Sequence, residues 1–405
     1  MSKRPTGLAP YELFFPLAAI ETVVAMVVSV VVFEGKLAPR SDLAPQLWHA
    51  HEMLFGHFPA AFAGVVLTAL PRWTRDRATG APGRPVPAAA TLILAALWLF
   101  GRVVMLTDPI PGSVALPAAA SALFPLVLAG VAGARIVEAR DLRDYGVVLL
   151  LVAFAAADGL FLIEGYRDAT TGVGLRLGLA GAAAGAMTLG GRILPALTRH
   201  LATSRGRPEI PPPPALFDAA ALAFGIAAAI LWVIAPLAPV TLLALGLAAA
   251  LHVVRLAFWR GWTVIDWPPF LALHAGYLFL PIGFALRAAS IAGGDDVTLA
   301  DAATHAWGVG TLGLMCVSIM TSVVRRYSDR GLVADRLANT VFAASALAIA
   351  LRFAAIAGGS PTQLVVAATV AWVATYGAFL GLVARDLVAR RAARFAWVPG
   401  AADRP

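Results

Sequence analysis

Long apolar stretches separated by short polar connections run through the chain from end to end. Each stretch has about 20 mostly apolar residues, the length of an α-helix that crosses a bilayer, and proline, glycine and arginine residues mark the boundaries. We therefore expect an all-α fold, a polytopic transmembrane bundle of about twelve helices in two six-helix halves. The predicted helices lie near residues 11–33, 48–70, 88–106, 114–134, 146–164, 173–195, 215–235, 240–257, 268–290, 301–323, 337–357 and 363–384.

The composition supports the same class of protein. Hydrophobic residues make up 60% of the chain and charged residues only 13%, and the mean hydropathy is +0.80. These values lie far from those of soluble globular domains, so they indicate an integral membrane protein. Cys316 is the one cysteine in the sequence, which excludes an intrachain disulfide.

A proline-rich segment divides the predicted helices into two sets. Pro211 to Pro214 form a run that cannot continue a helix and favours an extended conformation. The expected organisation is a first six-helix half at 1–204, a cytoplasmic linker at 205–214, a second half at 215–384 and a basic tail at 385–405. Two halves of this kind are also typical of transporters with internal repeats, although no motif pair recurs at corresponding positions.

The formal net charge of +8 follows membrane topology. Basic residues gather in alternate connections, the pattern that marks the cytoplasmic side. We therefore expect both termini in the cytoplasm, and we interpret the basic excess as attraction to anionic lipid headgroups and not to nucleic acid. The basic side holds Lys3, Arg4, Arg72, Arg75, Arg77, Arg84, Arg135, Arg140 and Arg143 among others, whereas the opposite connections hold Lys36, Arg40 and Arg167.

Histidines near the predicted outer ends of helices are the main candidates for ligand chemistry. His49 and His51 stand in the run 48–56, His305 opens the helix at 301–323, and His274 lies within the helix at 268–290. Ionisable groups in a bilayer cost roughly 2.5–3.5 kcal/mol each, so such residues are functional candidates. Because imidazole ligates haem iron and also copper, these four histidines are the predicted metal ligands.

Other readings of the polar residues stay open. A membrane histidine also serves as an interhelical hydrogen-bond donor, which is the interpretation favoured for His200 and His252. Glu52 is either a proton-transfer group, and so a candidate catalytic residue, or a charge placed against a helix dipole. Soft ligands for cuprous copper are Met53, Met315, Cys316 and Met320, although methionine usually fills apolar gaps.

Three intramembrane arginines are candidate cofactor-binding residues. Arg102 and Arg287 lie in outer halves of helices, and Arg192 lies near an inner helix end beside a double glycine and a proline. They could pair with haem propionates, or Arg102 with Glu52. The alternative is that their side chains extend to the membrane interface.

Several motifs together resemble the NnrS family of bacterial membrane proteins. The runs 48–56 and 63–74 are similar to the family signature, and 98–102, 190–198, 273–276 and 304–321 follow in the family's order. The resemblance implies an inner-membrane protein associated with haem, with copper and with the nitric oxide response. Since no CxxCH motif is present, the haem would be non-covalent haem b. At 327–331 this chain lacks the family's Gly-His-Thr-Gly-Arg run, and His57 replaces an expected aromatic residue.

Two functional classes follow from these observations. The first is a haem protein that binds nitric oxide or another small diatomic ligand, with redox turnover if a membrane electron donor is present. The second is a transporter or a metal- or haem-handling protein without redox catalysis. Motifs of soluble enzymes such as a phosphate loop or a nucleophile elbow are missing from the sequence. Whether the protein is an enzyme is left open.

Overall fold

The computed structural model describes residues 9–37, 42–76, 79–140, 144–170, 172–328 and 335–396, with no strand among them. In these ranges twelve helices are long and apolar enough to cross a membrane, which confirms the all-α polytopic fold. Parts of the charge pattern, including Arg40, Arg77, Arg143 and Arg330, lie outside the described residues, as do the first eight and last nine residues.

Within the described ranges, nine spans are uninterrupted helices. They are α1 (Pro10–Phe33), α4 (Ala88–Thr107), α5 (Ala115–Glu138), α6 (Tyr145–Asp168), α9 (Ala215–Ile234), α10 (Pro239–Phe258), α11 (Pro268–Ala292), α14 (Arg336–Ala357) and α15 (Thr362–Ala396). A short 3₁₀ helix, η4 (Gly261–Val264), connects α10 to α11.

The second, sixth and tenth spans are each interrupted by a π-helical segment. The second consists of α2 (Pro45–His51), η1 (Glu52–His57) and α3 (Phe58–Trp73). The sixth consists of α7 (Val173–Gly185), η3 (Ala186–Gly190) and α8 (Gly191–Ser204), and the tenth of α12 (Val297–His305), η5 (Ala306–Gly313) and α13 (Leu314–Tyr327). Segments of this type occur frequently at functional sites.

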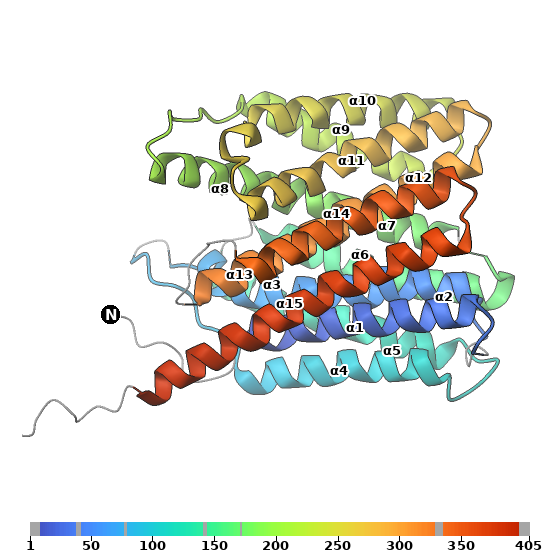
Figure 1. Cartoon of the computed structure of the whole chain (residues 1–405), viewed down its shortest axis with the longest axis horizontal. Helices are drawn as coiled ribbons and strands as arrows, with labels where there is room; N and C mark the ends of the chain where they lie inside the picture. Colours follow the sequence, from blue (N-terminus) through green and yellow to red (C-terminus); the bar gives the residue numbers. More distant parts are fainter. Residues whose placement is uncertain are drawn as a thin grey trace, which may run out of the picture.

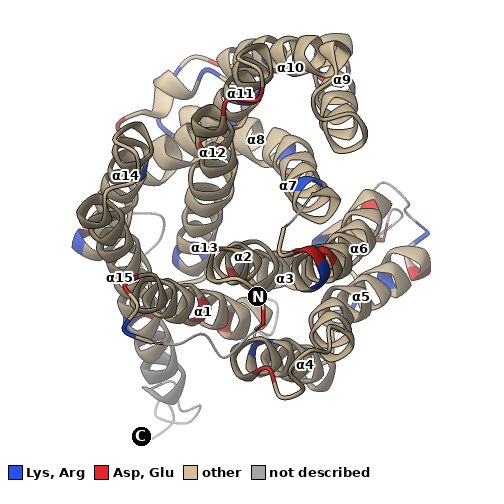
Figure 2. Cartoon of the chain, turned by 90° about the vertical axis from the view of Figure 1, so that its right-hand side faces the viewer, with Lys and Arg blue, Asp and Glu red and all other residues tan. Residues whose placement is uncertain are grey.

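These three interrupted spans form the centre of the bundle, and the other nine surround them in groups of three (Figure 2). The helices α4, α5 and α6 pack in sequence and lead back to α7, and α9, α10 and α11 connect α7 with α12 in the same way. The third group consists of α14, α15 and α1, with α1 against α3. Along the chain, an interrupted span recurs at every fourth position. The division into two six-helix halves stays a prediction.

Local sequence explains where many helices begin. Proline occupies the first turn of α1, α2, α10 and α11, where its missing N–H costs nothing. Asp335 caps α14 by accepting a hydrogen bond of 3.1 Å from the Ala338 N–H. Partial burial raises the pKa of the Asp335 carboxyl, but the Ala338 N–H, Arg325 and Arg385 outweigh it and hold the pKa below its usual value.

Glycine allows close helix packing at two contacts. A Cβ at Gly174 in α7 would lie 2.2 Å from the backbone nitrogen of Phe161 in α6. A Cβ at Gly64 in α3 would lie 2.4 Å from the ring of Phe15 in α1. Small residues therefore set the distance between these helices, as they do in other membrane bundles.

Candidate functional site

Two of the predicted ligand histidines line the same cavity. The cavity has a volume of about 380 Å³ and lies toward the end of the bundle where α2 and α12 begin, at the right of Figure 1. His49 of α2 and His305 of α12 both line it, and residues of η1, η5, α1, α7, α14 and α15 complete its walls. A space of this size falls in the range of about 300–1,000 Å³ typical of ligand pockets.

Ser29 fixes the tautomer of His49. The Ser29 hydroxyl donates its proton to the Ala25 carbonyl at 2.6 Å. The same oxygen lies 3.1 Å from His49 Nδ1 and therefore accepts a hydrogen bond from the Nδ1–H. A neutral imidazole carries one N–H, so His49 Nε2 keeps its lone pair. Nε2 has no hydrogen bond in the part of the chain that the structure describes, which leaves it available to ligate a metal.

Asp301 does the same for His305. The Nδ1 of His305 lies 2.9 Å from the backbone carbonyl of Asp301 and 2.9 Å from its carboxylate Oδ1. Histidines that ligate metals almost always donate their other N–H to a carboxylate or a carbonyl, which orients the ring and raises its basicity. The lone pair of His305 Nε2 is therefore available as well.

Arg352 supplies a cation beside these histidines. Its Nη2 lies 3.4 Å from Asp301 Oδ2, a long contact, and its Nε is buried with no hydrogen-bond partner within the described residues. The guanidinium thus has donor capacity left for an anionic group in the cavity. Arg352 was not among the residues expected from the sequence, although an arginine inside the apolar helix 337–357 is a signal for such a residue.

His57 lines the cavity but has both ring nitrogens engaged. Thr22 donates to the Ala18 carbonyl, so its oxygen, 2.7 Å from His57 Nδ1, accepts from the Nδ1–H. The Tyr376 hydroxyl donates to His57 Nε2 at 3.0 Å. His57 is therefore held as a neutral, hydrogen-bonded wall residue.

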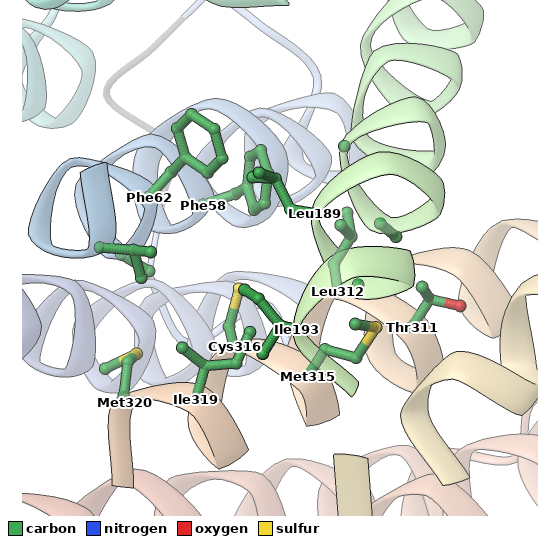
Figure 3. Close-up of a pocket in the computed structure, with 15 residues that line it drawn as sticks. Phe58, Phe62, Leu189, Ile193, Thr311, Leu312, Met315, Cys316, Ile319 and Met320 are labelled. Atoms are coloured by element: carbon green, nitrogen blue, oxygen red, sulfur yellow. The ribbon is translucent and has the colours of Figure 1, made fainter. Parts of the chain in front are cut away.

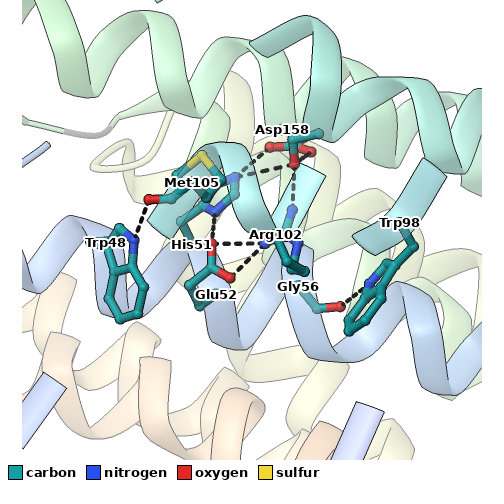
Figure 4. Close-up of polar contacts among 9 residues, drawn as sticks. Trp48, His51, Glu52, Gly56, Trp98, Arg102, Met105 and Asp158 are labelled. Atoms are coloured by element: carbon teal, nitrogen blue, oxygen red, sulfur yellow. Dashed lines mark hydrogen bonds and ion pairs between the residues drawn. The ribbon is translucent and has the colours of Figure 1, made fainter. Parts of the chain in front are cut away.

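Glu52 does not face this cavity. An α-helix would place His49, Glu52, Met53, Gly56 and His57 near one stripe, and His49, Met53 and His57 do line the cavity. Glu52 is instead directed toward α4, where its two carboxylate oxygens each lie 2.7 Å from Arg102 Nη1 (Figure 4).

A second polar cluster surrounds this ion pair. His51 Nδ1 lies 2.8 Å from Glu52 and its Nε2 lies 2.8 Å from Asp158 of α6. Ser121 of α5 accepts a hydrogen bond from Arg102 at 2.8 Å and donates to Asp158 at 2.6 Å. All five side chains are buried, so the two carboxylates depend on Arg102 and His51 for compensation of their charge (Figure 4). His51 thus lies apart from the cavity, with carboxylates at both ring nitrogens.

The remaining candidates lie elsewhere in the bundle. His274 of α11 donates from Nδ1 to the Phe270 carbonyl at 2.8 Å, and Thr198 of α8 lies 3.2 Å from its Nε2. The Arg192 side chain is 61% exposed and pairs with Asp144 at 2.7 Å. Arg287 pairs at 2.9 Å with Asp295, near the start of α12. None of these three lines the His49 cavity.

The described side chains do not form a cluster of three or more His, Cys, Asp or Glu residues that could hold a metal ion. For a metal-containing cofactor, these residues therefore offer one or two imidazoles beside a cavity of ligand size.

The fold and this cavity define a multi-pass membrane protein with a histidine-lined internal site. The family model described as NnrS protein matches residues 7–391, and the chain therefore belongs to the NnrS family. The motif resemblance in the sequence is confirmed by this match, which covers nearly the whole chain. Comparison with curated proteins gave no match.

Proposed function

We propose that the protein is a haem-binding membrane protein that binds or handles nitric oxide and supports tolerance to nitrosative stress. The observation that carries the proposal is the pair His49 and His305, which line one cavity with Nδ1 hydrogen-bonded and Nε2 available. Membership of the NnrS family agrees with a role in the nitric oxide response. Enzymatic turnover is not part of the proposal.

The residues of the cavity fit a non-covalent haem b. His49 and His305 would be the candidates to hold its iron, and Arg352, which lines the cavity and makes one long contact of 3.4 Å to Asp301, would pair with a propionate. The walls supply apolar contacts from residues such as Met26, Leu179 and Trp372. A ferrous haem, when bound, supplies an iron to which nitric oxide binds directly.

The protein's own groups would orient such a cofactor and keep its surroundings dry. Ser29 and Asp301 hold the two imidazole rings in the tautomer that ligates. His57 and Tyr376 satisfy each other's hydrogen bonds, so neither competes for the iron. The cavity therefore presents few free polar atoms, as expected of a cofactor site.

We further propose that the protein lies in the bacterial inner membrane with both termini in the cytoplasm. The described basic residues Arg72, Arg75 and Arg84 lie in the connection opposite to the end that holds His49, and cytoplasmic connections are enriched in such residues. The cavity would then lie toward the periplasmic side.

An optical spectrum of the detergent-purified protein tests the proposal. From haem-replete cells we expect a Soret band that shifts on dithionite reduction and again on addition of nitric oxide. His49→Ala and His305→Ala should each lower the bound haem or alter the Soret band. His200→Ala, at an exposed position outside the cavity, is the matched control and should leave the spectrum unchanged.

A colourless protein from haem-replete cells would reject the haem proposal and favour the transporter or metal-handling alternative. Unchanged spectra in both cavity variants would keep haem binding but reject this site for it. The experiment therefore tests separately whether the protein binds haem and whether the haem binds in this cavity.

A further inference from the structure

A second, smaller pocket lies where the three interrupted spans meet. Its volume is about 60 Å³, and all of its lining residues come from α3, the α7–η3–α8 span and the η5–α13 span (Figure 3). Small residues open the space, among them Ala61 of α3 and Ala186 and Gly190 of η3. The pocket is thus enclosed by the centre of the bundle and not by one of the outer helix groups.

The lining is almost entirely apolar. Figure 3 shows Phe58, Phe62 and Leu189 in the lining together with the sulfur-bearing side chains Met315, Cys316 and Met320, and Thr311 carries the one hydroxyl. A buried water needs about 2–4 polar partners, whereas a cavity above about 10–15 Å³ has room for one. The pocket therefore has space for a small molecule but not the hydrogen-bonding groups to hold water.

Leu312 connects this pocket with the histidine cavity. This residue lines both spaces, so the two are neighbours and Leu312 forms part of the wall between them. A small molecule could pass from one space to the other when Leu312 moves to another of its staggered rotamers.

We propose that this central pocket binds a small uncharged diatomic molecule and supplies it to the histidine cavity past Leu312. The volume and apolar lining define the class of ligand. The identification of nitric oxide as the molecule delivered rests on the proposed function. Apolar cavities of this kind stay dry and bind xenon, so xenon is a probe that does not depend on haem.

Crystals of the full chain under xenon pressure test the binding site. We expect an anomalous xenon peak among Phe58, Ala186 and Met315 in the wild type. Ala186→Leu adds three carbon atoms to the pocket and should abolish the peak, and Val65→Phe provides a second filling variant from a different span. Ala227→Leu adds the same atoms at an exposed position of α9 and should keep the peak.

A second measurement tests delivery in the haem-loaded protein. After photolysis of the nitric oxide complex, the filled variants should lose the slow phase of internal rebinding that Ala227→Leu retains. The absence of xenon from the wild-type pocket, or a lipid or detergent chain in it, would overturn the pocket assignment. Xenon binding in a protein without haem would leave the pocket valid while rejecting the proposed function. Unchanged rebinding in both filled variants would overturn the delivery step.

Discussion

Replacing Arg102 by methionine should destabilise the protein far more than removing an equally short ion pair at the surface. The Arg102 side chain is 8% exposed and that of Glu52 only 1%, with Nη1 2.7 Å from the carboxylate. Removing one partner leaves the other charge buried and uncompensated, which costs about 3–5 kcal/mol. Methionine keeps the volume and the apolar stem, so the loss is mainly electrostatic.

Arg192 provides the matched control. Its Nη1 also lies 2.7 Å from a carboxylate, that of Asp144, but its side chain is 61% exposed. Exposed pairs contribute about 0–1 kcal/mol, so Arg192→Met should have a small effect. The expected difference between the two variants is at least about 2 kcal/mol, roughly a 30-fold change in the unfolding equilibrium.

Reversible unfolding in mixed dodecylmaltoside and dodecyl sulfate micelles measures this difference. Adding Glu52→Gln to Arg102→Met should restore part of the lost stability, because the uncompensated charge is then gone. Equal costs for Arg102→Met and Arg192→Met would refute the reasoning that burial determines the strength of this pair. An unchanged cost in the double variant would show that lost packing, not charge, is responsible.

Three further predictions concern other parts of the structure. Asp301→Ala should weaken haem binding by up to about 10–100-fold, measured by haem titration, because His305 Nδ1 loses the carboxylate and keeps only the backbone carbonyl of residue 301; full affinity would show that the carboxylate does not support a ligand. Asp335 has a depressed pKa, so its charge should stabilise the protein above about pH 4 and the contribution should disappear as the pH falls further. Asp335→Asn, which keeps the cap, should flatten this part of the unfolding profile, and an unchanged profile would contradict it. Gly174→Ala should cost about 1–3 kcal/mol through overpacking, whereas Gly130→Ala, with no atom within 4 Å of the added Cβ, should not destabilise.

The helices were predictable because membrane insertion imposes length and hydropathy on each span separately. The predicted helix at 48–70 begins at Pro45 and ends at Trp73 in the structure, and the interrupted spans extend further than predicted. The π-helical segments were missed because they do not change the apolar composition. The helices that pack against them, such as α1 against η1 and α11 against η5, involve residues far apart in the sequence.

The candidate site was predictable only in part. His49 and His305 share the cavity, and the suggested pairing of Arg102 with Glu52 is confirmed. Ser29 and Arg352 were missed because their roles depend on contacts between helices. No spacing in one sequence indicates that the first and eleventh spans border the same cavity.

Different faces of the second span serve two polar sites of different character. His49 and Met53 face the cavity, while His51 and Glu52 belong to the buried cluster with Arg102. Because the charges of that cluster are compensated by one another, they do not need to be balanced by a ligand. The cavity in contrast is lined by two imidazoles with Nδ1 hydrogen-bonded, by Asp301, and by an incompletely paired Arg352. Such a site suits a cofactor with a large apolar body and few anionic groups, which is the chemistry of haem b.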